Sequence, residues 1–240
     1  EQLPCVFHVS ARTVSTHALN IFGDHSDVMA CRQTGFAMLC EGNVQEVMDL
    51  SPVAHLAALS GKVPFVNFFD GFRTSHEIQK IAVWDYKDLA EMCDMDAVKA
   101  FREHALNPEH PHMRGSHENG DTFFQHREAC NRYYDALPEV VESYMDKINA
   151  KLGTDYKLFN YYGAPDADRV IIAMGSICDV AEEVIDYLNA HGEKVGLIKV
   201  RLYRPFKADR LIEAIPATCK KIAVLDRTKE PGAQGEPLYL

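Results

Sequence analysis

The fold class is decided by residues 169–206, RVIIAMGSICDVAEEVIDYLNAHGEKVGLIKVRLYRPF. The first part, RVIIAMGS (169–176), is nearly all apolar, as is typical of a strand buried on both faces of a sheet. A helical segment, CDVAEEVIDYLNAHGE (178–193), separates it from a second strand, KVGLIKVRLYRPF (194–206). Another helix and another strand follow, at 207–215 and 220–227. Because strands and helices of this length alternate, we predict an α/β fold with a parallel sheet and right-handed crossovers.

The residues before this stretch show the same alternation. The apolar segment VPFVNFF (63–69) predicts another buried strand, and shorter strands are expected at 3–9 and 35–40. The pattern restarts near residue 156, so we predict two parallel-sheet domains, over 1–156 and 157–240. We also expect the chain to be an internal piece of a longer protein, with the beginning of the first domain and the end of the second missing.

Helices are expected in three parts of the first domain, of which DLAEMCDMDAVKAFREHAL (88–106) would form one or two. The segment 43–61 begins with Asn43 and Glu46 in the spacing of a capping box, and Pro52 inside it predicts a kink or a helix in two parts. The segment 137–153 is amphipathic and ends at a glycine, which is a common helix stop.

Composition excludes several classes of protein. The 240 residues are 47% hydrophobic and 25% charged, as in ordinary globular proteins, and carry a net charge of -10. That charge argues against nucleic acid and against anionic membrane surfaces as partners. No apolar run approaches the roughly 20 residues that span a bilayer, and no signal-peptide pattern opens the chain, so we do not expect secretion. The seven cysteines are scattered without a CxxC motif, which favours reduced thiols and gives no ligand set for an iron–sulfur cluster.

Arg12 stands where the first strand ends, in FHVSARTVSTHAL (7–19). Ligands of parallel α/β sheets bind outside the carboxyl ends of the strands, and a guanidinium matches a carboxylate with two parallel hydrogen bonds. Arg12 is therefore a candidate for binding an anionic substrate. The alternative is a structural arginine that lies on the surface or pairs with a carboxylate of the protein.

Two polar loops supply further candidates. GDHSDVMACRQTG (23–35) contains Asp24 and His25, and DGFRTSHE (70–77) contains Asp70 and Arg73 after the apolar strand. Each loop could form the wall of a site or only a surface turn. The second loop could equally begin a helix, capped by its threonine or serine.

Other motifs favour structural interpretations. The histidines of the irregular segment 107–127 lack a known zinc spacing, so we predict no metal site at His110, His112 and His117. Ser176 is expected to cap the following helix, because its turn lacks the glycines and lysine of phosphate-binding loops. No GxSxG elbow suggests a serine nucleophile. Arg201 and Arg204, at a strand end, could bind an anion or form an interdomain ion pair, and we favour the ion pair.

Taken together, several long motifs resemble the pyruvate:ferredoxin (flavodoxin) oxidoreductase family. They are FHVSARTVSTHALNIFGDHSDV, RQTGFAML, PFVNFFDGFRTSHEIQKI, NPEHPHMRG, YKLFNYYGAPDADRVIIAMGS, GLIKVRLYRPF and VLDRTKEPGA, and the resemblance runs from Val6 to Leu240. It implies a thiamine-diphosphate-binding pyrimidine domain, here truncated, followed by core domain II, which is similar to the C-terminal domain of transketolases. The parents in this family are large homodimers of anaerobic metabolism.

The resemblance also implies a reaction. These enzymes oxidatively decarboxylate pyruvate with coenzyme A to acetyl-CoA and CO2, and pass electrons to ferredoxin or flavodoxin. They use thiamine diphosphate with Mg2+ and [4Fe–4S] clusters, whose ligands would lie outside this chain. The cytoplasm or a reducing organelle such as a hydrogenosome would suit them. The alternatives are the same chemistry on another 2-oxoacid and a non-catalytic, transketolase-like docking module.

Among single residues, the resemblance assigns the substrate carboxylate to Arg12. Asp24, His25, Asp70 and Arg73 remain candidates for a site wall or an interdomain contact. The glutamate that activates the cofactor and a threonine that contacts pyruvate would precede residue 1, and the diphosphate-binding domain would follow residue 240. We therefore do not expect the 240 residues to turn over alone.

Overall fold

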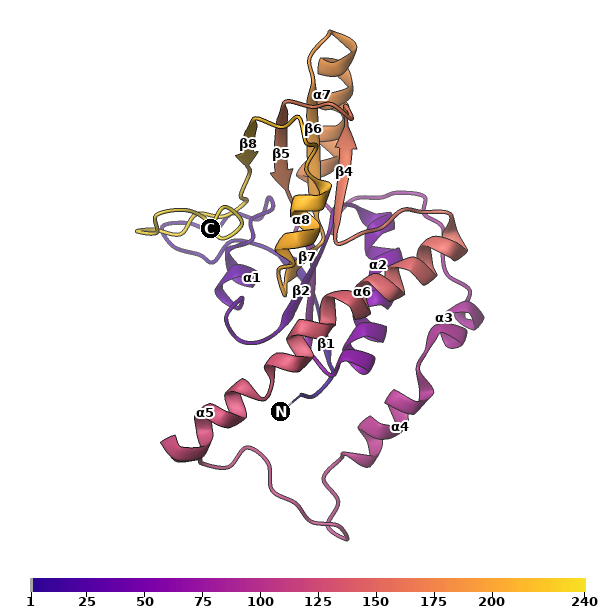
Figure 1. Cartoon of the computed structure of the whole chain (residues 1–240), viewed down its shortest axis with the longest axis vertical. Helices are drawn as coiled ribbons and strands as arrows, with labels where there is room; N and C mark the ends of the chain where they lie inside the picture. The colour runs from indigo at the N-terminus through magenta and orange to yellow at the C-terminus, as the bar shows by residue number, and fades with distance from the viewer. Residues whose placement is uncertain (1) are drawn as a thin grey trace.

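Two four-stranded sheets organise the chain in a computed structural model that describes residues 2–240 (Figure 1). The first sheet has the order β1-β3-β2-β7, with strands at Val6–Ala11, Phe65–Asp70, Ala37–Glu41 and Leu202–Arg204. The second has the order β4-β6-β5-β8, with strands at Phe159–Gly163, Val195–Val200, Arg169–Ala173 and Lys221–Val224. The predicted α/β class is confirmed.

The carboxyl ends of three parallel strands meet at one edge of the first sheet. In the register of β1 and β3, Ala11 lies opposite Asp70, and β2 runs in the same direction beside β3. Arg12 and Gly71 therefore leave the sheet side by side. Helix α2 (Val44–Gly61) connects β2 to β3 and packs against the sheet, because its apolar face consists of leucine, valine and alanine side chains that are fully buried.

Both sheets are mixed rather than purely parallel. β4 pairs with β6 in the antiparallel direction, and β7 does the same with β2. The prediction of one strand over 194–206 is wrong, because β6 ends at Val200 and β7 begins at Leu202 in the other sheet. Arg201 stands at this transfer, and its carbonyl accepts a hydrogen bond from the backbone N–H of Cys40 at 2.8 Å.

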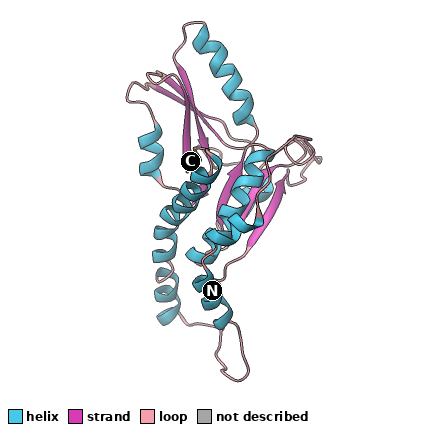
Figure 2. Ribbon diagram, turned by 90° about the vertical axis from the view of Figure 1, so that its right-hand side faces the viewer, coloured by secondary structure: helices cyan, strands magenta, loops and turns pink. Residues whose placement is uncertain are grey.

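A continuous hydrophobic core joins the two sheets. Leu39 and Phe65 from the first sheet and Ile172, Ile198 and Leu202 from the later part of the chain are buried in the same cluster. Helices α7 (Ile177–Ala190) and α8 (Ala208–Ala214) pack against the second sheet, and α1 (Ser26–Ala30) packs beside β1. Figure 2 shows the two groups of strands with helices beside them.

Four helices form the segment between β3 and β4. They are α3 (Tyr86–Met92), α4 (Met95–Glu103), α5 (Gly120–Glu128) and α6 (Asn131–Leu152). The long α6 packs on α2, whereas α4, α5 and the loop between them extend away from the sheets (Figures 1 and 2). α6 begins earlier than predicted, and Gly153 ends it in the left-handed conformation with φ 73°. α5 occupies part of 107–127, where no regular element was predicted.

The start of α2 follows its sequence signal. The side chain of Asn43 accepts a hydrogen bond from the backbone N–H of Glu46, as predicted for an N-cap. Glu46 in turn accepts from the backbone N–H of Gly42 at 2.8 Å. Pro52 lies inside α2 without dividing it into two helices. Within residues 2–240, no helix combines the length and the apolar character that crossing a membrane requires.

Candidate functional site

Arg12 is half-buried at the point where β1 leaves the sheet. Its backbone N–H donates to Oδ2 of Asp27 at 3.0 Å. Its side chain crosses the backbone of Gly71, where an added Cβ atom would lie 2.6 Å from Cγ of Arg12. Within residues 2–240, no carboxylate forms an ion pair with the guanidinium. Residues 2–240 therefore give no support to the alternative that Arg12 is a structural arginine paired with a carboxylate of the protein.

A groove of about 1120 Å³ begins at the residue after Arg12. Its walls come from residues 13–22 on one side and 228–231 on the other. Among the wall side chains, the exposed large apolar ones are Val14, Leu19, Ile21 and Phe22. Such a surface suits a flat, largely apolar ligand or the apolar face of another domain.

Asp24 and Arg73 both lie near this groove. Asp24 lines it and accepts a hydrogen bond from the backbone N–H of Ser26 at 2.6 Å. Arg73 is exposed, and its guanidinium lies 5.8 Å from the centre of the Phe22 ring. The loop that contains Arg73 does not begin a helix, since the next helix is α3.

His25 and Asp70 lie at a contact between the two halves of the chain. Both are fully buried, and Nε2 of His25 lies 2.5 Å from Oδ1 of Asp70. Oδ2 of Asp70 accepts from the backbone N–H of Ser176 at 3.0 Å, from its hydroxyl at 2.5 Å and from Nη1 of Arg227 at 2.5 Å. Asp70 thus contacts residues of the later part of the chain, and the role of His25 and Asp70 as a site wall or an interdomain contact stays a prediction.

The charge of Asp70 follows from these contacts. Burial alone would raise the pKa of Asp70, but the hydrogen bonds from His25 and Ser176 and the charge of Arg227 outweigh it and lower the pKa to about 2. The carboxylate is thus ionised and can accept every one of these hydrogen bonds. Because a carboxylate only accepts, Nε2 of His25 carries the proton between them.

Sequence analysis missed the partners of Asp70. Ser176 was expected to cap α7, but its side chain makes no capping hydrogen bond and donates to Asp70 instead. Arg227 lies in VLDRTKEPGA, a motif that was noted only for its resemblance. Ser176 lies in a polar turn directly after a buried strand, which is a pattern that could have marked it as a site residue. No sequence pattern near Arg227 indicates that it pairs with Asp70.

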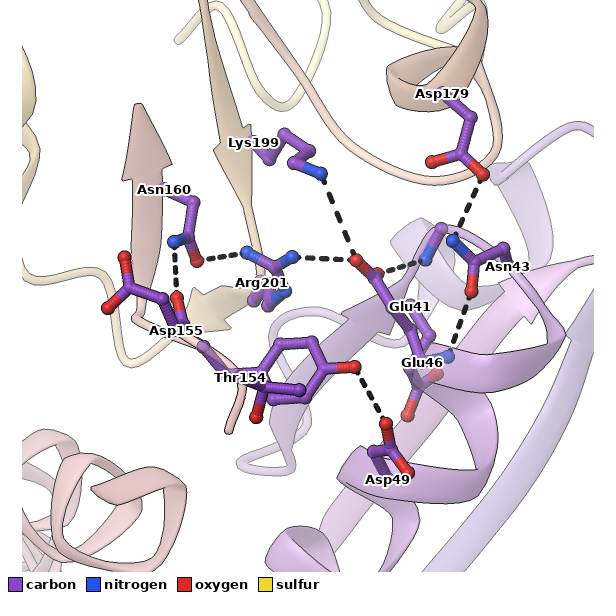
Figure 3. Close-up of polar contacts among 12 residues, drawn as sticks. Glu41, Asn43, Glu46, Asp49, Thr154, Asp155, Asn160, Asp179, Lys199 and Arg201 are labelled. Carbon is purple, nitrogen blue, oxygen red and sulfur yellow. Dashed lines mark hydrogen bonds and ion pairs between the residues drawn. The ribbon is translucent and has the colours of Figure 1, made fainter. Parts of the chain in front are cut away.

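A second polar cluster also joins the two halves (Figure 3). Arg201 is nearly fully buried, and its Nη2 donates to Oε1 of Glu46 at 2.6 Å. Asn160 accepts from the same guanidinium, and Nζ of Lys199 lies 4.0 Å from Oε1 of Glu46. The ion pair that we favoured for Arg201 is therefore present and joins the two halves of the chain. Arg204 is exposed and lies over the ring of its neighbour in sequence instead.

Glu41 is a buried acid that sequence analysis also missed. It ends β2, is fully buried, and neither carboxyl oxygen has a hydrogen-bond partner within the described residues. Burial, assisted by the negative charge of Glu46, raises the pKa of Glu41 well above its usual value, although Asn67 and Arg201 oppose the shift. The side-chain oxygen of Asn67, a neighbour of Glu41, also lacks a hydrogen-bond partner. A protonated carboxyl group has a donor for such an oxygen, so the neutral form of Glu41 matches this environment. The glutamate directly after the apolar strand was the available signal.

Two models of known protein families match successive parts of the chain. Residues 1–146 match the family model described as pyruvate flavodoxin/ferredoxin oxidoreductase, thiamine diphosphate-binding. Residues 167–239 match pyruvate:ferredoxin oxidoreductase core domain II. The chain belongs to the pyruvate:ferredoxin/flavodoxin oxidoreductase family.

Curated members of this oxidoreductase family match the chain along its whole length. It is 64% identical over 239 residues to the pyruvate:ferredoxin oxidoreductase of Moorella thermoacetica, and 64% identical over 240 residues to the pyruvate-flavodoxin oxidoreductase of Klebsiella pneumoniae. Each comparison covers 100% of this chain and 20% of the relative. The chain thus spans about a fifth of the length of these relatives.

A solved structure supports the fold. The chain resembles a 2-oxoglutarate:ferredoxin oxidoreductase from Magnetococcus marinus, solved with 2-oxoglutarate, coenzyme A and succinyl-CoA bound, with a TM-score of 0.58 and 21% identity. The match covers 93% of this chain and 41% of that one. At this identity the likeness concerns the fold alone.

The description of the first family model names thiamine diphosphate, so the groove can be compared with that cofactor. The groove's exposed apolar side chains suit the flat aminopyrimidine ring of the cofactor. Within residues 2–240, no group of three or more histidine, cysteine, aspartate or glutamate side chains is arranged to hold a metal ion. The exposed apolar residues of the groove therefore match the ring part of the cofactor.

Proposed function

We propose that this chain is the substrate-carboxylate-binding part of an enzyme that oxidatively decarboxylates pyruvate. With coenzyme A, the full-length enzyme would release CO2, form acetyl-CoA and pass two electrons to ferredoxin or flavodoxin. Family membership and 64% identity to curated pyruvate oxidoreductases support this assignment.

The observation that carries the proposal is the guanidinium of Arg12. Arg12 lies at the carboxyl edge of the sheet, is half-buried and has no ion-pair partner in residues 2–240, and the residue that follows it lines an apolar groove. A charged group in such a position can form two parallel hydrogen bonds with the carboxylate of a 2-oxoacid. Those bonds would fix the orientation of the substrate's carbonyl carbon and of the bond that breaks.

The remaining residues of the site would position and shield the substrate. Gly71 leaves room for the Arg12 side chain, and the apolar side chains of residues 14–22 would exclude water and receive the aminopyrimidine. Thiamine diphosphate, when bound, supplies the nucleophilic carbon and the electron sink for decarboxylation. Asp24 and Arg73 remain candidates for the wall of the site.

Several properties of the full-length enzyme belong to the same proposal. They are a domain boundary near residue 156, Mg2+ and [4Fe–4S] clusters held outside this chain, and a homodimeric assembly. All seven cysteines are free thiols, which supports a reducing compartment. This compartment would be the cytoplasm or an organelle such as a hydrogenosome.

A second 2-oxoacid is the competing assignment within the same chemistry. Arg12 would bind the carboxylate of any 2-oxoacid in the same way, so this residue does not distinguish pyruvate from another 2-oxoacid. A non-catalytic docking module is the competing assignment from another class.

The test is an anaerobic assay of the full-length protein with coenzyme A and a viologen dye as electron acceptor. We expect reduction of the dye with pyruvate and much slower reduction with 2-oxoglutarate. A preference for 2-oxoglutarate would assign the other substrate. No reduction with any 2-oxoacid, in protein loaded with thiamine diphosphate and its clusters, would favour the docking module.

A further inference from the structure

The carboxylate of Asp70 connects the second half of the chain to the edge of the first sheet. Asp70 ends β3, while Ser176 precedes α7 and Arg227 follows β8. Arg227 donates from Nη1 both to Asp70 and, at 2.8 Å, to the hydroxyl of Ser176. Asp70 is fully buried and ionised, so this contact is a charge-assisted one in a largely desolvated place.

The residue after Asp70 determines where Arg12 can lie. The backbone N–H of Gly71 donates to the carbonyl of Ala11 at 2.8 Å. An added Cβ atom at Gly71 would lie 2.4 Å from that carbonyl oxygen and 2.6 Å from Cγ of Arg12. The side chain of Arg12 therefore lies directly against the backbone that Asp70 anchors, and a shift of that backbone displaces it.

Arg227 also holds a second segment that contacts Arg12. Its Nε donates to the carbonyl of Gly23 at 3.1 Å, and its own carbonyl accepts from the backbone N–H of His25 at 2.9 Å. Two residues further on, Asp27 accepts from the backbone N–H of Arg12 at 3.0 Å. One side chain of the second half thus fixes both segments between which Arg12 lies.

We propose that Arg227 is a positioning residue for substrate binding, which acts through Asp70 and Gly23 to hold Arg12 in its binding geometry. The inference rests on the proposed function, since it concerns the substrate that Arg12 binds. In this role the second half of the chain does more than pack against the first, because it sets the geometry of the substrate site without touching the substrate.

The test compares Arg227→Met with a matched variant of the full-length enzyme, Arg210→Met. Arg210 pairs with Glu142 between α8 and α6 at 2.9 Å, so the control also removes an ion pair between the two halves, on elements that do not hold Arg12. For Arg227→Met we expect the KM for pyruvate to rise roughly 10- to 100-fold, because a small misplacement of a binding group has an effect of that size. The KM for coenzyme A and the Tm should change no more than in the control.

Two milder variants separate positioning from general destabilisation. Arg227→Lys keeps the charge and should restore most of the affinity for pyruvate. Ser176→Ala removes one hydroxyl donor to Asp70 but keeps the backbone N–H, and should raise the KM for pyruvate by a smaller factor.

An unchanged KM for pyruvate in Arg227→Met, or an equal rise in Arg210→Met, would overturn the proposal. Failure of the proposed function is recognised separately, because the wild-type enzyme would then show no preference for pyruvate. A wild-type enzyme that uses pyruvate, together with an Arg12→Ala variant of unchanged KM, would refute the role of Arg12 and with it that of Arg227.

Discussion

Nη2 of Arg201 lies 2.6 Å from Oε1 of Glu46, and both side chains are almost completely buried between the two sheets (Figure 3). Burial raises the pKa of Glu46, but the positive charges of Arg201 and Lys199 and the hydrogen bond from Gly42 bring it below its usual value. The pair is thus a buried ion pair at the point where the chain changes sheets. Such pairs are sensitive to the loss of one partner, because the other charge is left without compensation.

Removing Arg201 alone should destabilise the enzyme strongly. For Arg201→Met we expect a loss of about 3 kcal/mol, the lower end of the range for buried pairs, since Lys199 partly compensates Glu46. The double variant Arg201→Met/Glu46→Met should recover much of this loss, because no buried charge remains. The Tm of the full-length protein measures both effects.

An exposed ion pair provides the control for that experiment. Arg169 pairs with Glu193 at the surface, where solvent screens the attraction between the two charges. Arg169→Met should therefore lower the Tm only slightly. If Arg201→Met were as stable as Arg169→Met, the buried Arg201–Glu46 pair would contribute nothing to the stability of the fold.

The buried acid Glu41 should make stability fall as the pH rises. The pKa of Glu41 is raised in the folded state, so the folded protein keeps a proton that the unfolded chain releases above the usual pKa of 4.5. Its stabilising contribution is complete below that value. It is lost by up to about 1.4 kcal/mol per pH unit as the pH rises toward the folded pKa.

Glu41→Gln should remove this dependence, because glutamine is a neutral side chain of nearly the same shape. Between pH 5 and pH 8, calorimetry should show that the Tm of Glu41→Gln increases relative to the Tm of the wild type as the pH rises. Glu103→Gln, which alters an exposed residue of α4, should follow the wild-type curve. Parallel curves for wild type and Glu41→Gln would show that Glu41 is ionised throughout the range.

Gly71→Ala should weaken binding of the 2-oxoacid, because the new methyl group would collide with Ala11 and the stem of Arg12. We expect the KM for pyruvate to rise roughly tenfold, together with a loss of stability of about 1–3 kcal/mol. Gly120→Ala is the matched control, since no atom lies within 4 Å of its added Cβ. A normal KM in Gly71→Ala would indicate that Arg12 does not depend on this contact.

The sequence predicts the parts of the fold that depend on local patterns. The buried strand 63–69, the N-cap at Asn43 and the helix stop at Gly153 are all found close to the expected positions. Alternation of apolar and polar residues and the conformational preferences of single residues are enough for these features. The position of Arg12 at a strand end followed from the same reasoning.

Features that depend on contacts distant in sequence were not predicted. β7 reads as a continuation of β6, and only its pairing with β2 separates the two strands. Ser176 has the sequence of a helix cap, yet the negative charge of Asp70 is a stronger acceptor for its hydroxyl. Glu41 was missed because burial of a strand end depends on what packs over it. Local sequence carries no information about such partners.

The most direct test of the account is the kinetic comparison of Arg12→Ala with the full-length wild type. Loss of a charge-assisted contact predicts a fall in kcat/KM for pyruvate of roughly tenfold to several hundredfold. Arg12→Lys should lie between the two, and Arg132→Ala, at an exposed guanidinium of α6, should match the wild type. A pyruvate-active enzyme whose kcat/KM is unchanged by Arg12→Ala would contradict the claim that Arg12 binds the substrate.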